Sequence, residues 1–229
     1  MQRAFDNVIH DVALQNLGVV MCLDRGGLVG EDGATHHGAY DLAYLCCIPN
    51  LVVAAPYNEL ELRNMMYTAS LAARPIAIRY PRGEGDGSAW RNQPFQTIEI
   101  GRGRCLREGV DTAILSIGAI GIEVTKAIES ATAQGANPAH YDMRWAKPLD
   151  TEILRTAATR FGHIITVEDG SLQGGVGCSI ECQLRDMGFQ GKVTRLGIPD
   201  QFIEHGTINQ LRTLCHIDAQ SICKAILDK

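Results

Sequence analysis

The highest density of side chains that could do chemistry lies in DRGGLVGEDGATHHGAYD, residues 24 to 41. Its glycines allow tight turns and a close approach of the backbone to a ligand. Arg25 could bind an anion through paired hydrogen bonds, Asp32 could orient a hydroxyl group, and His36 could transfer a proton near neutral pH. The stretch indicates a polar binding or catalytic site; the alternative is a long surface loop with a structural ion pair.

A second candidate is Arg82 in the sequence PRG, residues 81 to 83. Both stretches follow short apolar runs that predict buried parallel strands. The carboxyl ends of parallel strands meet at one edge of a sheet, where ligands bind. Two arginines at one edge favour a phosphate or carboxylate ligand. The alternative for Arg82 is a solvated arginine in a turn that ends a strand.

The remaining motifs predict structural roles. GSLQGGVGCS, residues 170 to 179, has the glycines of a phosphate loop but lacks its Lys-Ser/Thr pair. Glu168 and Asp169 before it would repel a phosphate, so we predict a turn where a helix packs closely on a strand. Cysteines without Cys-x-x-Cys spacing indicate reduced thiols; the alternative is a metal site at Cys178 and Cys182. Single histidines in unremarkable settings are expected to be structural, namely His10, His140, His163, His205 and His216.

The elements that position these residues alternate between strand and helix. Apolar runs predict strands at 18–24, 50–56 and 75–83. A helix is predicted after Asn58, which can cap it together with Glu61, and residues 4–13 have helical spacing. Strand, helix and strand in alternation predict a parallel α/β sheet.

A second α/β unit follows a polar, glycine-rich segment. We place a first domain at 1–84, a linker with one or two edge strands at 85–110, and a second domain at 111–229. Strands of the second domain are expected at 112–121, 163–170 and 192–200, and helices at 121–135, 151–162, 174–188 and 208–229. The fold class is therefore α/β, with two consecutive parallel-sheet domains.

Composition limits the function classes. The chain of 229 residues carries a net charge of −5 and no basic block, which argues against a nucleic-acid partner. Its first residues are amphipathic and include acids, unlike a signal peptide, and no apolar run approaches the ~20 residues of a membrane span. These features predict a soluble cytoplasmic protein without a membrane partner.

Several stretches along the chain are shared with a known family. They are MQRAFDNVIHDVALQNL, LDRGGLVGEDGATHHGAYDLAYLCCIPNLVVAAP, IRYPRGEG, YDMRWAKPLD, VEDGSLQGGVG and LGIPDQFIEHG. Together they closely resemble the 1-deoxy-D-xylulose-5-phosphate synthase family of transketolase-like thiamine-diphosphate enzymes. Transketolases and the β subunits of 2-oxoacid dehydrogenases share the architecture but not the run at 24–41.

The resemblance implies a fold and a reaction. The fold would comprise a pyrimidine-binding domain, truncated at its amino-terminal end, and a transketolase C-terminal domain. The reaction of the family, a transferase, condenses pyruvate with D-glyceraldehyde 3-phosphate and releases CO₂, and its product feeds isoprenoid, thiamine and pyridoxal synthesis. The implied cofactors are thiamine diphosphate and Mg²⁺, and the implied assembly is a homodimer.

The resemblance also assigns site residues. Arg3, Arg25 and Arg82 match arginines associated with the phosphate of the acceptor substrate or its surroundings, whereas Arg79 is the less favoured arginine of IRYPRG. Asp32 and His36 match the acid and the histidine of the substrate pocket. A phosphate dianion suits arginine forks, and His36 suits a proton donor to a developing alkoxide.

The Gly-Asp-Gly metal motif of the family, and its glutamate that activates the aminopyrimidine ring, have no match in this sequence. The resemblance therefore implies a C-terminal portion of the synthase that is inactive alone, with no metal ligand and no assignable cofactor-binding residue. We also expect an incomplete sheet or an exposed sheet edge. Two alternatives stay open, namely the C-terminal subunit of a split transketolase-like enzyme and a non-catalytic dimerisation module.

Overall fold

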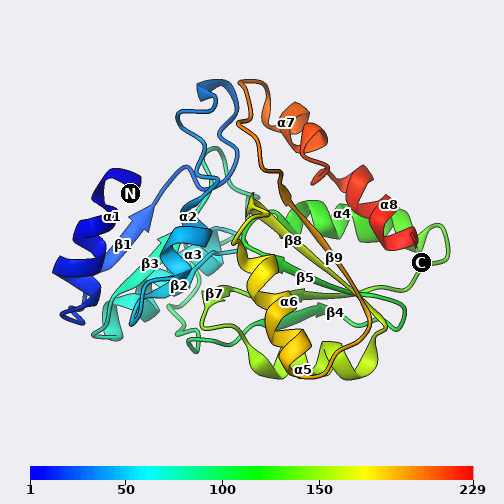
Figure 1. The fold of residues 1–229 in the computed structure, drawn as a ribbon, viewed down its shortest axis with the longest axis horizontal. Helices are drawn as coiled ribbons and strands as arrows, with labels where there is room; N and C mark the ends of the chain where they lie inside the picture. The colour runs from blue at the N-terminus through cyan, green and yellow to red at the C-terminus, as the bar shows by residue number, and fades with distance from the viewer. Residues whose placement is uncertain (229) are drawn as a thin grey trace.

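The computed structural model describes residues 1–228, in which two β-sheets lie side by side with helices packed around them (Figure 1). The first sheet has the strand order β1-β3-β2-β7. Its strands are β1 (Val20–Leu23), β2 (Val52–Ala54), β3 (Ile76–Arg79) and β7 (Trp145–Lys147). The first three are parallel, as predicted, and β7 pairs antiparallel with β2. Both β2 and β3 are buried along their whole length, which explains their continuous apolar sequences.

The second sheet has the strand order β4-β6-β5-β8-β9. Its strands are β4 (Arg104–Arg107), β5 (Ala113–Ile117), β6 (Ala139–Asp142), β8 (His163–Ser171) and β9 (Lys192–Ile198). All neighbours are parallel except β4, which pairs antiparallel with β6. The predicted α/β class with two mostly parallel sheets is confirmed, and each sheet carries one antiparallel edge strand.

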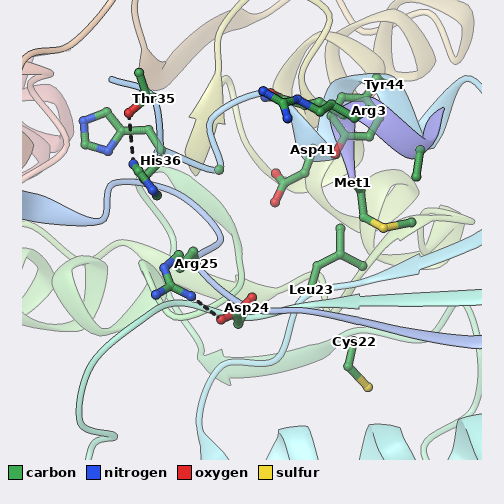
Figure 2. Close-up of a pocket in the computed structure, with 14 residues that line it drawn as sticks. Met1, Arg3, Cys22, Leu23, Asp24, Arg25, Thr35, His36, Asp41 and Tyr44 are labelled. Carbon is green, nitrogen blue, oxygen red and sulfur yellow. Dashed lines mark hydrogen bonds and ion pairs between the residues drawn. The ribbon is translucent and has the colours of Figure 1, made fainter. Parts of the chain in front are cut away.

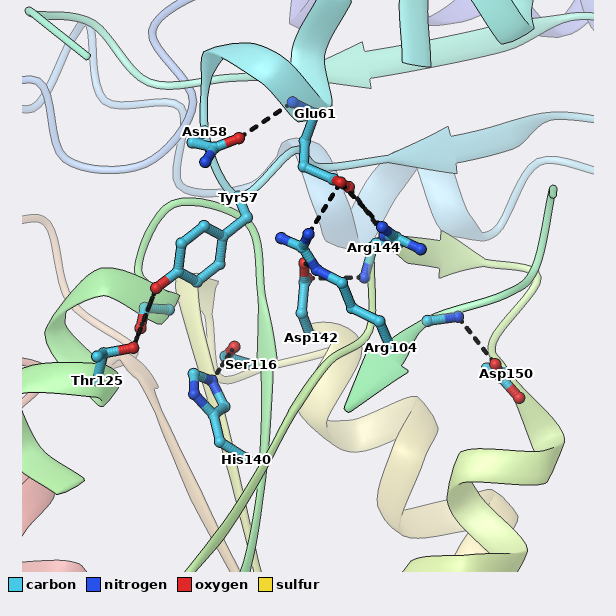
Figure 3. A network of polar contacts seen from close by, with 12 residues as sticks. Tyr57, Asn58, Glu61, Arg104, Ser116, Thr125, His140, Asp142, Arg144 and Asp150 are labelled. Carbon is cyan, nitrogen blue, oxygen red and sulfur yellow. Dashed lines mark hydrogen bonds and ion pairs between the residues drawn. The ribbon is translucent and has the colours of Figure 1, made fainter. Parts of the chain in front are cut away.

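The first half begins with one continuous helical segment that changes from 3-10 to α to π geometry. It comprises η1 (Gln2–Ala4), α1 (Phe5–Asn7) and η2 (Val8–Ala13), followed by η3 (Gly30–Asp32), α2 (Asp41–Cys46) and α3 (Glu59–Leu71). The predicted cap of α3 is confirmed, because the Asn58 side chain accepts the Glu61 N–H at 3.0 Å. The Glu61 carboxylate binds Arg144 and Arg104 instead of completing a capping box (Figure 3).

The helices of the second half cover both faces of the second sheet. They are α4 (Gly121–Thr132), α5 (Thr151–Arg160), α6 (Val176–Asp186), α7 (Ile208–Leu214) and α8 (Ala219–Leu227). The single last helix predicted at 208–229 is wrong. The chain turns at His216, whose φ is 57°, and Asp218 then caps a new helix by accepting the N–H groups of Gln220 and Ser221. Two short helices result, and α8 packs on α4.

The largest hydrophobic core joins the two sheets. It contains Val53 of the first sheet, Leu115 of the second, and Leu45 of α2, which is completely buried. Helix α2 contacts β2, β7 and β8, so it packs between the sheets. Because one core spans both sheets, the loop before α2 is held between the two halves of the chain.

One edge of the first sheet is exposed in the part of the chain that the structure describes. β1 pairs only with β3 there, and Val20 and Cys22 are exposed on it. This agrees with the expected exposed edge. The prediction of a buried strand at 18–24 is wrong, because within residues 1–228 β1 has a neighbouring strand on one side only and just Leu23 of its four residues is buried. In residues 1–228, no helix is both long and apolar enough to cross a membrane.

Candidate functional site

The loop at 24–41 leaves the carboxyl end of β1 and returns along itself before α2. Gly27 and Gly38 exchange backbone hydrogen bonds of 3.0 and 2.9 Å. The Gly26 N–H donates to the carbonyl of Tyr80, directly after β3, at 2.9 Å. The loop therefore lies at the carboxyl edge of β1 and β3, where the sequence predicts a ligand site. We call residues 24–41 the site loop.

A cavity of about 520 Å³ opens beside the site loop. Its lining includes Arg3 from the first helical turn, and Arg25 and His36 from the two arms of the loop. In Figure 2, Arg25 and His36 lie on one side of the cavity, and Arg3 and Asp41 lie on the other. Three of the five predicted site residues are therefore brought together from distant parts of the sequence.

The other two predicted residues lie next to Arg25 and do not line this cavity. Arg82 forms an ion pair with Asp32, and the Arg25 Nε lies 3.9 Å from the same carboxylate. Arg25 also donates to the Asp24 carboxylate at 2.7 Å. Two arginines thus share Asp32, and an anion that binds them competes with carboxylates already present.

Backbone geometry at Arg25 is unusual for a residue with a side chain. Its φ is 58°, in the left-handed region that most residues avoid. Such conformations are retained where surrounding structure enforces them, often at functional sites. Here the strained residue is also the arginine that reaches the cavity.

The two adjacent histidines have different surroundings. His36 is exposed, and its Nδ1 lies 2.9 Å from the Thr35 hydroxyl. His37 is buried, and its Nδ1 accepts the Val29 N–H at 3.1 Å. Because Nδ1 accepts this hydrogen bond, the ring can donate only through Nε2, which has no partner among the described residues. His36 suits proton transfer, whereas His37 holds the fold of the loop.

Arg79 has a structural position, although the sequence places it in a candidate motif. Its side chain is only 4% exposed, and its Nε donates to both oxygens of Asp41 at 3.1 and 3.2 Å. Burial alone would lower the pKa of Arg79, but the carboxylates of Asp41 and Asp169 outweigh burial and raise it. Arg79 therefore stays charged beneath the site loop.

Sequence reasoning missed Asp41 and Tyr44, which also line the cavity. Burial, followed by the charge of Asp41, raises the pKa of Tyr44 to about 12. A signal for Asp41 was available, because a charged residue inside the apolar strand IAIRY requires a buried partner of opposite charge. The sequence could not show which carboxylate it is.

The glycine turn before α6 packs a helix on a strand, as predicted. A β-carbon at Gly175 or Gly177 would overlap Glu168 or Thr166. The Glu168 carboxylate accepts the N–H groups of Val176 and Gly177 at 3.0 and 2.8 Å, and burial raises its pKa to about 6. An internal carboxylate already occupies this helix N-terminus.

The described residues do not fit a Mg²⁺ ion. Within residues 1–228, no group of three or more His, Cys, Asp or Glu side chains could hold a metal ion. The alternative of a metal site at Cys178 and Cys182 therefore has no support from the described residues. The Cys178 thiol instead donates to the Leu172 carbonyl at 3.2 Å and contacts Arg195.

Two family models match the chain. Residues 1–86 match the transketolase pyrimidine-binding domain, and residues 101–222 match the transketolase C-terminal domain.

The chain belongs to the transketolase family.

Curated relatives refine this assignment. The chain is 56% identical, over 99% of its length, to a 1-deoxy-D-xylulose-5-phosphate synthase of Parabacteroides distasonis, and 53% identical to the synthase of Bacteroides fragilis. It spans only 36% and 35% of the length of these relatives. The resemblance predicted from the sequence is confirmed: this transketolase-family chain is similar to the C-terminal portion of these synthases.

Solved structures support the fold. A split-gene transketolase, described as an inactive β4 tetramer, superposes with a TM-score of 0.84 at 26% identity. That match covers 98% of this chain and 70% of the solved chain. A transketolase from Campylobacter jejuni superposes with a TM-score of 0.68 at 21% identity, covering 92% of this chain and 31% of the other.

Proposed function

We propose that this chain is the C-terminal portion of a 1-deoxy-D-xylulose-5-phosphate synthase and supplies the site for the phosphorylated acceptor. In the complete enzyme it would serve the condensation of pyruvate with D-glyceraldehyde 3-phosphate, with loss of CO₂. The observation that carries the proposal is the convergence of Arg3, Arg25 and His36 on one cavity. The names of the curated relatives support the reaction.

The arginines would bind the phosphate of the acceptor. Arg25 and Arg82 share Asp32, and Arg3 faces the same cavity as Arg25. A guanidinium presents paired N–H donors that match two phosphate oxygens. Phosphate binding would displace Asp32 from one arginine, and the freed carboxylate would accept a hydrogen bond from a substrate hydroxyl.

His36 would act on the aldehyde of the acceptor. When a carbon nucleophile adds to an aldehyde, negative charge develops on the aldehyde oxygen and must be neutralised. The Thr35 hydroxyl lies at His36 Nδ1, so Nε2 is the nitrogen available to deliver the proton. The residues of this chain would thus bind the acceptor and protonate its aldehyde oxygen.

The proposal includes the state of the chain by itself. We propose that it is inactive alone, because it spans about a third of its relatives and its described residues do not fit Mg²⁺. We also propose a homodimeric, cytoplasmic enzyme divided into domains at 1–84 and 111–229. A second candidate is a subunit of a split transketolase-like enzyme, which the similarity to the split-gene transketolase favours.

Calorimetric titration tests the proposed site directly. The purified chain should bind D-glyceraldehyde 3-phosphate more tightly than D-glyceraldehyde, because the arginines recognise the phosphate. Arg25→Ala should weaken binding of the phosphorylated ligand about tenfold, because the substitution removes a hydrogen bond between charged groups. Arg74→Ala is the matched control, since Arg74 is exposed outside the cavity. Equal affinity for the two aldehydes, or equal loss in both variants, would overturn the assignment.

A further inference from the structure

A buried ion pair lies where the site loop ends. Arg79 at the end of β3 and Asp41 at the start of α2 are 4% and 5% exposed, and their charged atoms lie 3.1 Å apart. Neither belongs to the part of the loop that carries Arg25 and His36. The pair fixes the point where the loop enters α2.

Arg79 also binds the backbone on both sides of this point. Its Nη2 donates to the Gly38 carbonyl at 3.2 Å and to the Asp169 carbonyl at the end of β8. One guanidinium therefore connects β3, the second arm of the site loop, and the second sheet. A lysine could not do this, because it lacks the planar fork with donors in several directions.

The second sheet holds the loop through its own groups. The Asp169 carboxylate accepts the Leu28 N–H at 3.0 Å, and the Ser171 N–H donates to the Ala39 carbonyl at 2.7 Å. The carboxylate of Asp169 also packs directly against Gly27, where a β-carbon would overlap it. Both arms of the loop are thus bound by residues about 130 to 140 positions further along the chain.

Arg25 and His36 have little support of their own. Both are exposed, and their side chains contact only other loop residues, Asp24, Asp32 and Thr35, among the polar contacts of the described chain. Their direction into the cavity therefore depends on the backbone of the loop. That backbone is held by Arg79 and Asp169.

We propose that Arg79 and Asp169 are positioning residues, through which the second sheet holds the site loop in the shape that directs Arg25 and His36 into the cavity. The proposal deepens the proposed function and rests on it for the ligand, D-glyceraldehyde 3-phosphate. The holding of the loop is a separate claim about the backbone. It can be measured without a ligand.

The test compares Asp169→Ala, which removes the acceptor for the Leu28 N–H, with Asp169→Asn, which keeps a carbonyl acceptor of similar size. Hydrogen exchange measured by mass spectrometry reports the opening of residues 24–41. Calorimetry reports the affinity for D-glyceraldehyde 3-phosphate. Ile222→Ala, in the buried core between α4 and α8, serves as a control for general loss of stability.

Asp169→Ala should speed hydrogen exchange in the site loop about tenfold or more, as expected for one lost buried hydrogen bond. It should weaken the affinity for D-glyceraldehyde 3-phosphate to a similar degree. Asp169→Asn should restore most of both. Ile222→Ala should leave both unchanged at a temperature where it is as folded as Asp169→Ala. If Asp169→Ala does not fold, Arg79→Lys takes its place with the same expected effects.

Two results separate the proposals. Faster loop exchange in Asp169→Ala, with no measurable ligand binding by the unmodified chain, would support the positioning role and remove the proposed function. Unchanged loop exchange in Asp169→Ala, or an equal increase in Ile222→Ala, would overturn the positioning role.

Discussion

Glu61 of α3 and Arg144, just before β7, form a two-pronged ion pair, with Nε–Oε2 and Nη2–Oε1 distances of 2.8 and 2.9 Å (Figure 3). Arg104 of β4 approaches the same carboxylate at 3.1 Å and also binds Asp142 of β6. Glu61 is 5% exposed. The network joins α3 and β7 on the side of the first sheet to β4 and β6 of the second sheet.

Glu61→Gln should therefore destabilise the chain strongly. Removing one member of a buried ion pair leaves its partner charge uncompensated, which costs about 3 kcal/mol or more. Glu108→Gln breaks the exposed pair with Arg160 and should leave stability unchanged within error. Urea unfolding of both variants at neutral pH measures the difference, and similar losses in the two would show that the Glu61 network has no special weight.

Gly27→Ala should destabilise more than a glycine substitution in open space. Gly27 has a φ of 80°, and its β-carbon would overlap the Asp169 carboxylate. Gly188 has a similar φ of 86° with nothing within 4 Å, so Gly188→Ala measures backbone strain alone, about 1 kcal/mol. The extra overlap in Gly27→Ala should add about 1 to 3 kcal/mol, as overpacking does. Equal melting temperatures of the two variants in thermal unfolding would contradict the close contact between the site loop and the second sheet.

His140 should make stability fall in acid. Burial, and then the charge of Arg104, lowers the pKa of His140 to about 4, and its Nε2 lies 2.8 Å from the Ser116 hydroxyl. Between about pH 6.5 and 4, the unfolded chain binds a proton that the folded chain does not, so the free energy of unfolding decreases by up to about 3 kcal/mol.

The measurement is urea unfolding of the unmodified chain and of His140→Gln at pH 7.5 and 4.5. The unmodified chain should lose about 2.5 kcal/mol more than the variant over this interval. Burial raises the pKa of Asp142 and Glu168 to about 6, so these groups act in the opposite direction, but both are present in both proteins. Equal losses would mean that His140 titrates normally.

Asp32→Asn should separate phosphate recognition from sugar recognition. Loss of the carboxylate frees Arg82 and leaves Arg25 paired only with Asp24. Inorganic phosphate should therefore bind about two- to fivefold more tightly, as expected when an exposed ion pair no longer competes for the arginines. The preference for D-glyceraldehyde 3-phosphate over phosphate should shrink, because the hydroxyl loses its acceptor. Glu31→Gln is the control with the same change in net charge. Equal effects of both substitutions would mean that Asp32 acts only through the net charge of the chain.

Two strands of the first sheet were predictable, because parallel strands buried on both faces have continuous apolar sequences. β2 and β3 are buried at every residue and match the predicted runs. The helix after Asn58 was predictable from its local cap. The sequence also predicted Arg25 and His36 at one ligand site after the end of a strand, and both residues line the same cavity.

Long-range partners were not predictable. β7 has only three residues and pairs antiparallel with β2, about ninety positions earlier in the chain. A strand this short has no recognisable period of apolar residues. The burial of Arg79 depends on Asp41 and on a carbonyl 90 positions away. The break at His216 depends on a left-handed residue inside a helical apolar pattern, which the pattern alone does not reveal.

The central claim is tested most directly by formation of 1-deoxy-D-xylulose 5-phosphate. The purified chain receives pyruvate, D-glyceraldehyde 3-phosphate, thiamine diphosphate and Mg²⁺, with and without a separately expressed N-terminal portion of the Parabacteroides distasonis synthase. Product should form only with the added portion, and the Arg25→Ala chain should need about ten times more D-glyceraldehyde 3-phosphate to support the same rate. Product from the chain alone would contradict the proposal that this chain supplies the acceptor site and not the cofactor site.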